Sequence, residues 1–326
     1  MNYTLKIVFF LLFAPLLKAQ ENLILNGDFE EYWECPDYAE QIERCKYVYN
    51  PLPYGNLSGF NSSSDYMNSC SAFANVPNTF NGYQHAFHGN GFIGIFNMDN
   101  PNFHYREYVQ LEFSEELECG SIYTFSGYFN LANPYRYSTK NIGFFFSKEE
   151  VEEQDYLYNL YTPQYVDRFT EITDTANWTK ISFDFAADKN YRFVNIGHYE
   201  KDSTDSYIEI DQNAIVQSFA TYLNIDSVSL VKKGTITLNI PNVFTPNGDG
   251  VNDVFIIDEN KNLFQEMLIF NRWGNQVAKL SDSLVWDGNS NNESVSDGIY
   301  FYILTPNEGC KSMKNTNYQG MIHLIR

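Results

Sequence analysis

Three carboxylates stand beside segments that read as strands near the two ends of the first part of the chain. Asp28 and Glu30 follow a short apolar segment at 23–25, and Asp226 lies in the alternating apolar and polar segment 222–231. Such oxygen donors suit calcium, which takes six to eight oxygen ligands in flexible geometry. We predict a structural calcium at Asp28, Glu30 and Asp226. The alternative is a cap that these carboxylates form through hydrogen bonds.

Two loop-like segments, residues 80–88 and 133–137, are rich in aromatic rings and polar groups. Apolar faces of sugars stack on flat rings, while amides and carboxylates orient sugar hydroxyls. The glycan-binding residues that this pattern predicts are Tyr83, His85, His88, Tyr135 and Tyr137. The alternative is structural. The chain holds 25 tyrosines and 27 phenylalanines, and a tyrosine-rich β protein exposes many rings in any case.

A turn cluster in the last third of the chain carries four side chains whose oxygens could bind a cation: Asn247, Asp249, Asn252 and Asp253. The spacing is not that of an EF-hand, because the glutamate that closes such a loop is absent. The alternative is that these residues hydrogen-bond their own backbone, as Asn and Asp do in turns.

Enzyme-like motifs fail on their sequence context. Residues 89–94 match G-x-G-x-x-G, but they continue into a predicted strand, whereas a dinucleotide site needs a helix there. His85 and His88 lack the spacing of four and the adjacent glutamate of a zinc protease. A glycosidase would need two carboxylates about 5–10 Å apart in a cleft, and the sequence does not select such a pair. We predict a protein that is not an enzyme, with a secreted glycoside hydrolase as the remaining alternative.

Residues 1–19 have the pattern of a secretory signal peptide. Lys6 precedes an apolar run at 7–17, and Ala19 supplies the small residue at the cleavage point. That run is too short to span a bilayer, which takes about 20 residues. No later stretch is long and apolar enough, so no transmembrane segment is predicted.

The charge balance restricts the partners. The chain has 41 acidic and 21 basic residues and a net charge of -20. A field of that sign repels phosphate backbones, which excludes nucleic acid as a partner and suits a surface protein.

The cysteines indicate an oxidising compartment. None of the five forms a C-x-x-C pair, and an export signal favours disulfides over a metal site. We predict two disulfides among Cys35, Cys45, Cys70 and Cys119, with the pairing left open. Cys310 is then left over as a buried or reactive thiol.

The distribution of residues predicts an all-β protein of two domains. Tyr, Phe, Val, Ile and Thr favour strands, and turn residues recur about every ten positions. A first domain at 20–232 is separated from a second at 238–326 by a linker at 233–237, where Lys232, Lys233 and Gly234 interrupt the alternation. Within the first domain, strands are expected at 109–113, 121–129, 142–146, 178–185 and 193–199, and a short helix or a loop at 149–158.

The first domain resembles galactose-binding-like jelly rolls, the fold of many carbohydrate-binding modules. The resemblance lies in the opening N-G-D-F-E at 26–30 and the closing I-D-S-V-S-L at 225–230. Interior segments at 64–70, 76–84, 105–109 and 141–147 are similar to secreted domains of Bacteroidetes. The resemblance implies that the first and last strands pair, and related modules often hold calcium at this seam. Here Ser227 replaces the usual second acidic residue.

The second domain resembles the gliding motility-associated C-terminal domain, the type B sorting domain of the type IX secretion system. The resemblance lies in N-I-P-N-V-F-T-P-N-G-D-G-V-N-D at 239–253, L-I-F-N-R-W-G-N at 268–275, W-D-G at 286–288, D-G-I-Y-F-Y at 297–302 and the closing segment 318–326. It implies a small Ig-like β-sandwich that the outer-membrane translocon recognises. A permanent adhesive domain is the alternative for these residues.

Together these patterns predict a secreted or cell-surface protein. The signal peptide takes it to the periplasm, the sorting domain takes it to the outer surface, and the jelly-roll passenger binds a surface polysaccharide or other glycan. The alternative is a structural or adhesion protein without a small ligand.

Overall fold

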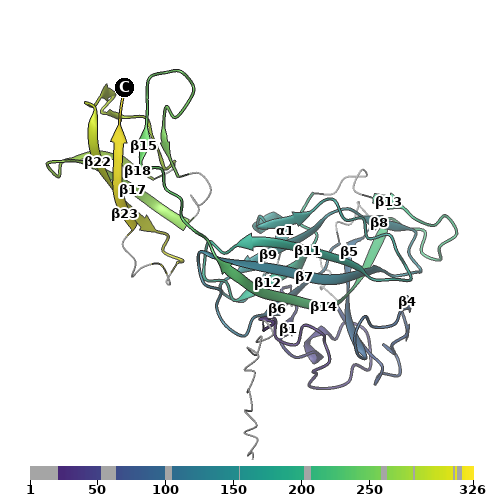
Figure 1. Cartoon of the computed structure of the whole chain (residues 1–326). Helices are drawn as coiled ribbons and strands as arrows, with labels where there is room; N and C mark the ends of the chain where they lie inside the picture. The colour runs from purple at the N-terminus through teal and green to yellow at the C-terminus, as the bar shows by residue number, and fades with distance from the viewer. Residues whose placement is uncertain are drawn as a thin grey trace, which may run out of the picture.

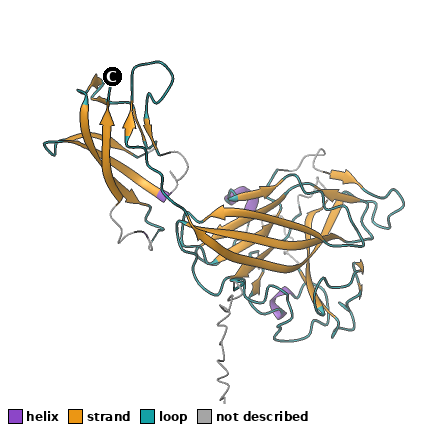
Figure 2. Ribbon diagram, viewed as in Figure 1, coloured by secondary structure: helices purple, strands orange, loops and turns teal. Residues whose placement is uncertain are grey.

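The structure is a computed structural model that describes residues 21–52, 64–99, 105–153, 155–201, 207–257, 263–281, 283–310, 313 and 318–326. The predicted signal peptide lies outside the described residues. Strands and loops make up nearly all of the described chain (Figure 2). The helical pieces are a 3-10 turn, η1 (Ile42–Arg44), and one α-helical turn, α1 (Leu157–Leu160). The predicted all-β class is confirmed.

The first domain is a sandwich of two five-stranded sheets (Figure 1). The first sheet contains, in spatial order, β1 (Val48–Tyr49), β6 (Tyr108–Glu112), β12 (Phe193–Gly197), β9 (Ile142–Ser147) and β10 (Tyr165–Asp167). The second contains β11 (Thr179–Ala186), β7 (Ser121–Leu131), β14 (Ala220–Thr235), β5 (Gly91–Asp99) and β2 (Asp65–Asn68). From β5 to β7 consecutive strands alternate between the two sheets, as do β9, β11, β12 and β14. This alternation is that of the predicted jelly roll.

Aromatic rings fill the space between these sheets. On β7, buried and half-buried residues alternate, so that Tyr123, Phe125 and Phe129 point into the core. The Phe125 ring lies 4.8 Å from that of Phe144 on the opposite sheet and 5.2 Å from that of Phe183. Such ring pairs add about 0.5–1.5 kcal/mol each beyond the burial of apolar area. The high aromatic content therefore has a structural role in this domain.

Other elements cover the sandwich. Segment 149–158 was expected as a short helix or a loop, and its described residues are loop up to the start of α1. Val151 and Leu157 pack on Tyr108 and Tyr199 in a second apolar cluster. Two small two-stranded sheets complete the domain: the hairpin of β3 (Asn78–Thr79) with β4 (Gly82–Tyr83), and the pair of β8 (Tyr137–Thr139) with β13 (Tyr207–Glu209).

The second domain is a smaller sandwich. Its main sheet contains, in order, β15 (Val243–Phe244), β23 (Tyr318–Leu324), β22 (Gly298–Pro306), β17 (Phe264–Asn271) and β18 (Gln276–Leu280). Two pairs complete it: β16 (Phe255–Ile256) with β19 (Val285–Trp286), and β20 (Asn289–Ser290) with β21 (Glu293–Ser294). The buried Trp286 ring lies 5.3 Å from Phe244 and 5.0 Å from Tyr300, at the centre of this core.

At the junction between the domains, the last strand of the first domain extends further than the sequence predicted. The interruption at Lys232–Gly234 is a register shift within β14, and the strand continues to Thr235. The pairing of β14 with β7 holds this extension, because Thr235 lies opposite Ser121 and Gly234 opposite Ile122. A bulge in a long paired strand and the end of a strand look alike in sequence, since both interrupt the alternation.

The disulfides correct the sequence prediction. Cys35 pairs with Cys70, and Cys119 pairs with Cys310. Cys45 is the free cysteine and is 1% exposed. The number of disulfides was predicted correctly, but Cys45 was wrongly included and Cys310 wrongly left over. Counting cysteines within one domain missed a bridge that joins two domains.

Candidate functional site

The seam between the opening and closing segments runs along β14, the central strand of the second sheet. The Leu23 N–H donates to the Leu230 carbonyl at 2.8 Å, and the Val228 N–H donates to the Gly27 carbonyl at 2.7 Å. The two motifs therefore lie side by side, as expected. The approach at Gly27 is close, because a Cβ there would lie 2.1 Å from the Val228 carbonyl oxygen.

Two of the three predicted calcium ligands bind backbone amides. Glu30 accepts hydrogen bonds from the N–H groups of Asn90 and Gly91 at 2.6 and 2.8 Å. Asp226 accepts them from Phe87 and His88 at 2.6 and 3.1 Å, and burial raises the pKa of Asp226 to about 7. These contacts match the hydrogen-bonded cap.

The third predicted ligand, Asp28, lies near a histidine, with its Oδ2 atom 4.0 Å from Nδ1 of His88. Within the described ranges, no group of three or more His, Cys, Asp or Glu side chains is arranged to hold a metal ion. Calcium at this seam stays a prediction.

The predicted cation turn also bonds its own backbone. Asp253 accepts from the N–H groups of Gly248 and Gly250, both at 2.7 Å, and these bonds lower its pKa. The side chains of Asn247 and Asp249 each accept from an N–H two residues on. Asn252 supplies a positive φ of 54°. This geometry is that of an Asx-rich turn.

The predicted glycan-binding residues fall into different surroundings. Tyr83 and His85 are exposed neighbours, with the tyrosine hydroxyl 2.9 Å from Nε2. His88 is also exposed. Tyr135 is buried against Tyr222, which agrees with the structural alternative for that ring.

Tyr137 is half-buried, and its ring contacts residues other than Tyr83 and His85. It stacks on Phe219 with ring centroids 4.5 Å apart, and the guanidinium of Arg136 lies 5.2 Å from its ring. Its face is thus partly occupied by the protein itself.

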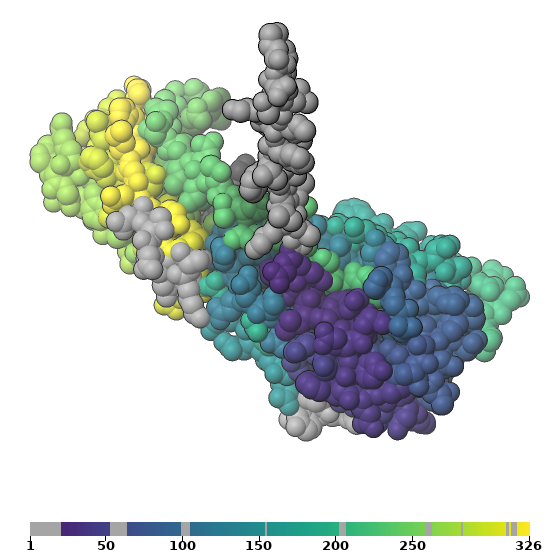
Figure 3. Space-filling model, turned by 60° about the horizontal axis from the view of Figure 1, so that its bottom comes forward, coloured from purple at the N-terminus to yellow at the C-terminus, as the bar shows by residue number. Residues whose placement is uncertain are grey.

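A more continuous aromatic surface lies where loops 31–44 and 70–88 meet. The Tyr38 ring stacks on Phe73 at 4.8 Å, and Phe73 stacks on Phe80 at 5.1 Å. These three rings, which we call the aromatic patch, are 61%, 41% and 36% exposed. The N-terminal segments that carry them lie together on the face brought forward in Figure 3.

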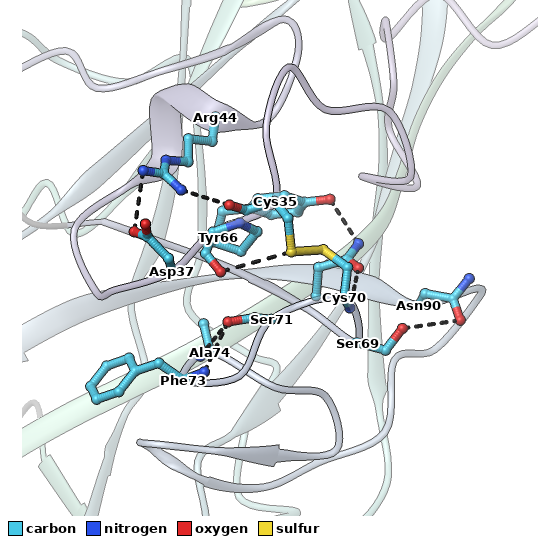
Figure 4. The surroundings of a disulfide bond; sticks show 12 residues. Cys35, Asp37, Arg44, Tyr66, Ser69, Cys70, Ser71, Phe73, Ala74 and Asn90 are labelled. Carbon is cyan, nitrogen blue, oxygen red and sulfur yellow. Dashed lines mark hydrogen bonds and ion pairs between the residues drawn. A yellow bond between two sulfur atoms is a disulfide. The ribbon is translucent and has the colours of Figure 1, made fainter.

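The Cys35–Cys70 disulfide ties together the two loops that carry the patch (Figure 4). The Arg44 guanidinium reinforces the first loop, because it donates to the Cys35 carbonyl at 2.6 Å and lies 3.2 Å from Asp37. Phe73 projects away from the disulfide, toward solvent.

Polar groups border the aromatic patch. The Gln41 side chain accepts from the N–H groups of Asp37 and Tyr38 and donates to the Asp37 carboxylate. This hydrogen bond, with the nearby Arg44, keeps the pKa of Asp37 below its ordinary value. Sequence reasoning included Phe80 in its candidate segment but missed Tyr38 and Phe73. The cysteines on both loops were the signal that could have joined them.

The second domain exposes an apolar sheet face. On β22, Ile299, Phe301 and Ile303 point outward and are 44%, 44% and 41% exposed, while the residues between them point into the core. Met321 lies opposite Phe301 on β23 and is 53% exposed. A groove of about 580 Å³ runs over this face and is also lined by Phe270 and Arg272.

The described chain thus holds two β-sandwiches, and each of them exposes a cluster of apolar or aromatic side chains. Residues 238–324 match the family described as CHU_C Type IX secretion signal domain. The sorting domain predicted at 238–326 is therefore confirmed, and the chain is exported to the cell surface or secreted. No helix in the described ranges is long and apolar enough to cross a membrane.

Other comparisons are more distant. Curated proteins give no match. The K2 adhesin domain of Lys-gingipain is similar at 11% identity and a TM-score of 0.37, over 66% of this chain and 99% of that one. The K1 adhesin domain of Lys-gingipain from Porphyromonas gingivalis is similar at 12% identity and a TM-score of 0.31, over 58% of this chain and 92% of that one. The CBM22-1 xylan-binding domain of Xyn10C from Paenibacillus barcinonensis is similar at 9% identity and a TM-score of 0.28, over 62% of this chain and 99% of that one. Likeness at this level carries no functional argument.

Proposed function

We propose that the first domain binds polysaccharide at the cell surface through the aromatic patch of Tyr38, Phe73 and Phe80. The observation that carries this proposal is that three stacked rings remain exposed in a row on loops held by a disulfide. Exposed apolar groups that cluster within a polar rim mark interaction sites, whereas scattered ones need no explanation.

The chemistry of the patch fits a sugar chain. Each of the three residues keeps at least 36% of its surface exposed, and the apolar faces of pyranose rings can pack on exposed aromatic surface. Asp37, Gln41 and Arg44 beside Tyr38 supply acceptors and donors for hydroxyl groups. The disulfide limits the motion of the loops, so less conformational entropy is lost on binding.

Two buried carboxylates of the first domain are closed to a catalytic role. Asp65 and Glu107 are 3% and 0% exposed and accept hydrogen bonds from the buried Tyr222 and the half-buried Tyr105, so a substrate does not reach these two carboxylates in this conformation. The remaining alternative, adhesion to another surface protein without a glycan, is separated from the proposal by the following experiment.

The test uses the purified mature chain with defined polysaccharides: β-1,4-glucan, xylan, mannan, chitin and agarose. We expect retention on at least one of them in affinity electrophoresis, and a loss of at least tenfold in affinity for Phe73→Ala. Phe169→Ala is the matched control, because Phe169 is 90% exposed and is not part of the patch. Binding that is equal in Phe73→Ala and the wild-type chain would exclude the patch. Binding to none of the polysaccharides would favour the adhesion alternative.

For the second domain, we propose that the apolar face around Phe301 is the surface that contacts the outer-membrane translocon. A secretion signal must be recognised by the export machinery, and this face is a contiguous apolar surface on the sheet that holds β22 and β23. An apolar groove offers a partner hydrophobic burial of roughly 25 cal/mol per Å². Export of a Phe301→Glu variant tests this proposal.

A further inference from the structure

The Cys119–Cys310 disulfide crosses from the first domain to the second. Cys119 lies just before β7 of the first sandwich, and Cys310 follows β22 of the second, 191 residues later. Both are buried, at 6% and 0% exposure, and both belong to the apolar cluster of the second domain. The bond is thus part of a packed junction.

Further contacts hold the same junction. The Asn190 N–H donates to the Gly309 carbonyl at 3.1 Å, beside the disulfide. The Ile236 N–H donates to the Gly120 carbonyl at 2.8 Å. Because Gly120 and Asn190 belong to the first domain, these hydrogen bonds join it to the connector and to the segment that carries Cys310.

The polypeptide itself connects the domains through residues 236–242, which lie between the end of β14 and the start of β15 (Figure 1). Ile236, Leu238 and Ile240 pack on the second core, while Thr237 and Asn239 are exposed. Exposed connecting segments are preferred sites of proteolysis. Cleavage in this connector would cut the only peptide link between the domains.

We propose that the Cys119–Cys310 disulfide is a covalent latch that keeps the sorting domain attached to the passenger after proteolysis of the connector. Hydrolysis of one peptide bond consumes a water and leaves a new carboxylate and a new amine, and the two fragments stay joined through sulfur. Release then requires a thiol reductant, which is oxidised to its disulfide as two cysteine thiols form. Proteolysis and separation become two chemically distinct steps.

The test uses the full mature chain, with the recognition sequence of a site-specific protease inserted after Asn239. After complete cleavage, denaturing electrophoresis without reductant is expected to show a single species at the mass of the uncut chain, and dithiothreitol is expected to resolve two fragments. The Cys119→Ala/Cys310→Ala chain should separate without reductant. Cys35→Ala/Cys70→Ala is the matched control and should stay joined. Separation of the cleaved wild-type chain without reductant would overturn the proposal.

Thiol counting tests the latch without any variant that could fail to fold. The chain has five cysteines. With both disulfides formed, the denatured and unreduced wild-type chain reacts with one equivalent of a thiol reagent, at Cys45. Three equivalents would mean that one disulfide is absent. Peptide mapping that finds Cys119 and Cys310 among the labelled residues would overturn the latch.

Discussion

The Tyr222 hydroxyl donates a hydrogen bond of 2.5 Å to Oδ2 of Asp65, inside the first domain. The other Asp65 oxygen accepts from the Glu40 N–H at 2.7 Å. Asp65 is 3% exposed, and burial, with the nearby Glu107, raises its pKa to about 8. The carboxyl therefore links β2 and β14 to the loop that also carries Tyr38, and it is protonated at neutral pH.

The raised pKa makes stability depend on pH. In the unfolded chain the Asp65 pKa is about 3.9, so between roughly pH 4 and 8 the folded chain binds more protons at this site than the unfolded chain. Its contribution to the free energy of unfolding is complete below pH 4 and is lost as pH rises through 8. We expect Asp65→Asn to flatten the fall in stability between pH 5 and 9, measured by urea unfolding. Glu43→Gln, at an exposed carboxylate, should leave the slope unchanged. Equal slopes in Asp65→Asn and the wild-type chain would refute the assignment.

The Asp226 cap predicts a cost for a nearly isosteric change. Its carboxylate accepts from the N–H groups of Phe87, His88 and Ser227. In Asp226→Asn the amide NH₂ would face at least one of these donors, so we expect a loss of about 1–3 kcal/mol in the free energy of unfolding. Thermal unfolding with calcium or with a chelator tests the metal at the same time. A calcium-dependent rise in Tm that the variant lacks would establish the predicted calcium, and an unchanged stability of the variant would contradict the cap.

Much of the fold could be predicted from the sequence, because its strands are local patterns. The strands at β6, β7, β9, β11 and β12 agree with the expected segments to within about two residues. The second domain was found through a series of motifs in a fixed order. The end of β14 was not predicted correctly, because the register shift between Lys232 and Gly234 interrupts the alternation of apolar and polar residues just as the end of a strand does.

The candidate site was harder to predict, because it depends on contacts between distant segments. The Cys35–Cys70 disulfide places the loop of Tyr38 next to the segment of Phe73 and Phe80, so predicting their proximity requires knowing which cysteines pair. Four candidate cysteines left three pairings open. Tyr135 shows the reverse case. Its loop-like sequence suggested exposure, while packing against Tyr222 buries it.

The free thiol of Cys45 should be unreactive in the folded chain. It is 1% exposed, and burial raises its pKa far above the ordinary range, so the thiolate that reacts with alkylating agents is scarce. We expect no incorporation of iodoacetamide at pH 8 in buffer, and one equivalent in denaturant. Mass spectrometry locates the label, and labelling of Cys45 at full rate without denaturant would show that this region opens.

The Cys35–Cys70 disulfide should stabilise the domain and position the aromatic patch. A bridge over a separation of 35 residues restricts the unfolded chain, and its loss costs about 2–4 kcal/mol. We expect Cys35→Ala/Cys70→Ala to unfold at lower urea concentration and to bind polysaccharide more weakly while still folded, because the loops that carry Tyr38 and Phe73 are no longer joined. Unchanged affinity in a destabilised variant would show that η1 and the Arg44 contacts suffice to hold the patch.

Export should depend on the apolar face of the second domain. Phe301 points outward from β22, so Phe301→Glu places a charge on that face without removing a core side chain. A buried charge at an apolar interface costs several kcal/mol, enough to prevent docking. We expect the variant to accumulate in the periplasm of the exporting host, measured by fractionation of cells and medium. Ser281→Glu adds the same charge at an exposed position after β18 and should be exported normally. A purified Phe301→Glu chain with a Tm close to that of the wild-type chain would show that folding is retained. Normal export of such a folded variant would mean that the translocon recognises another surface of residues 238–324.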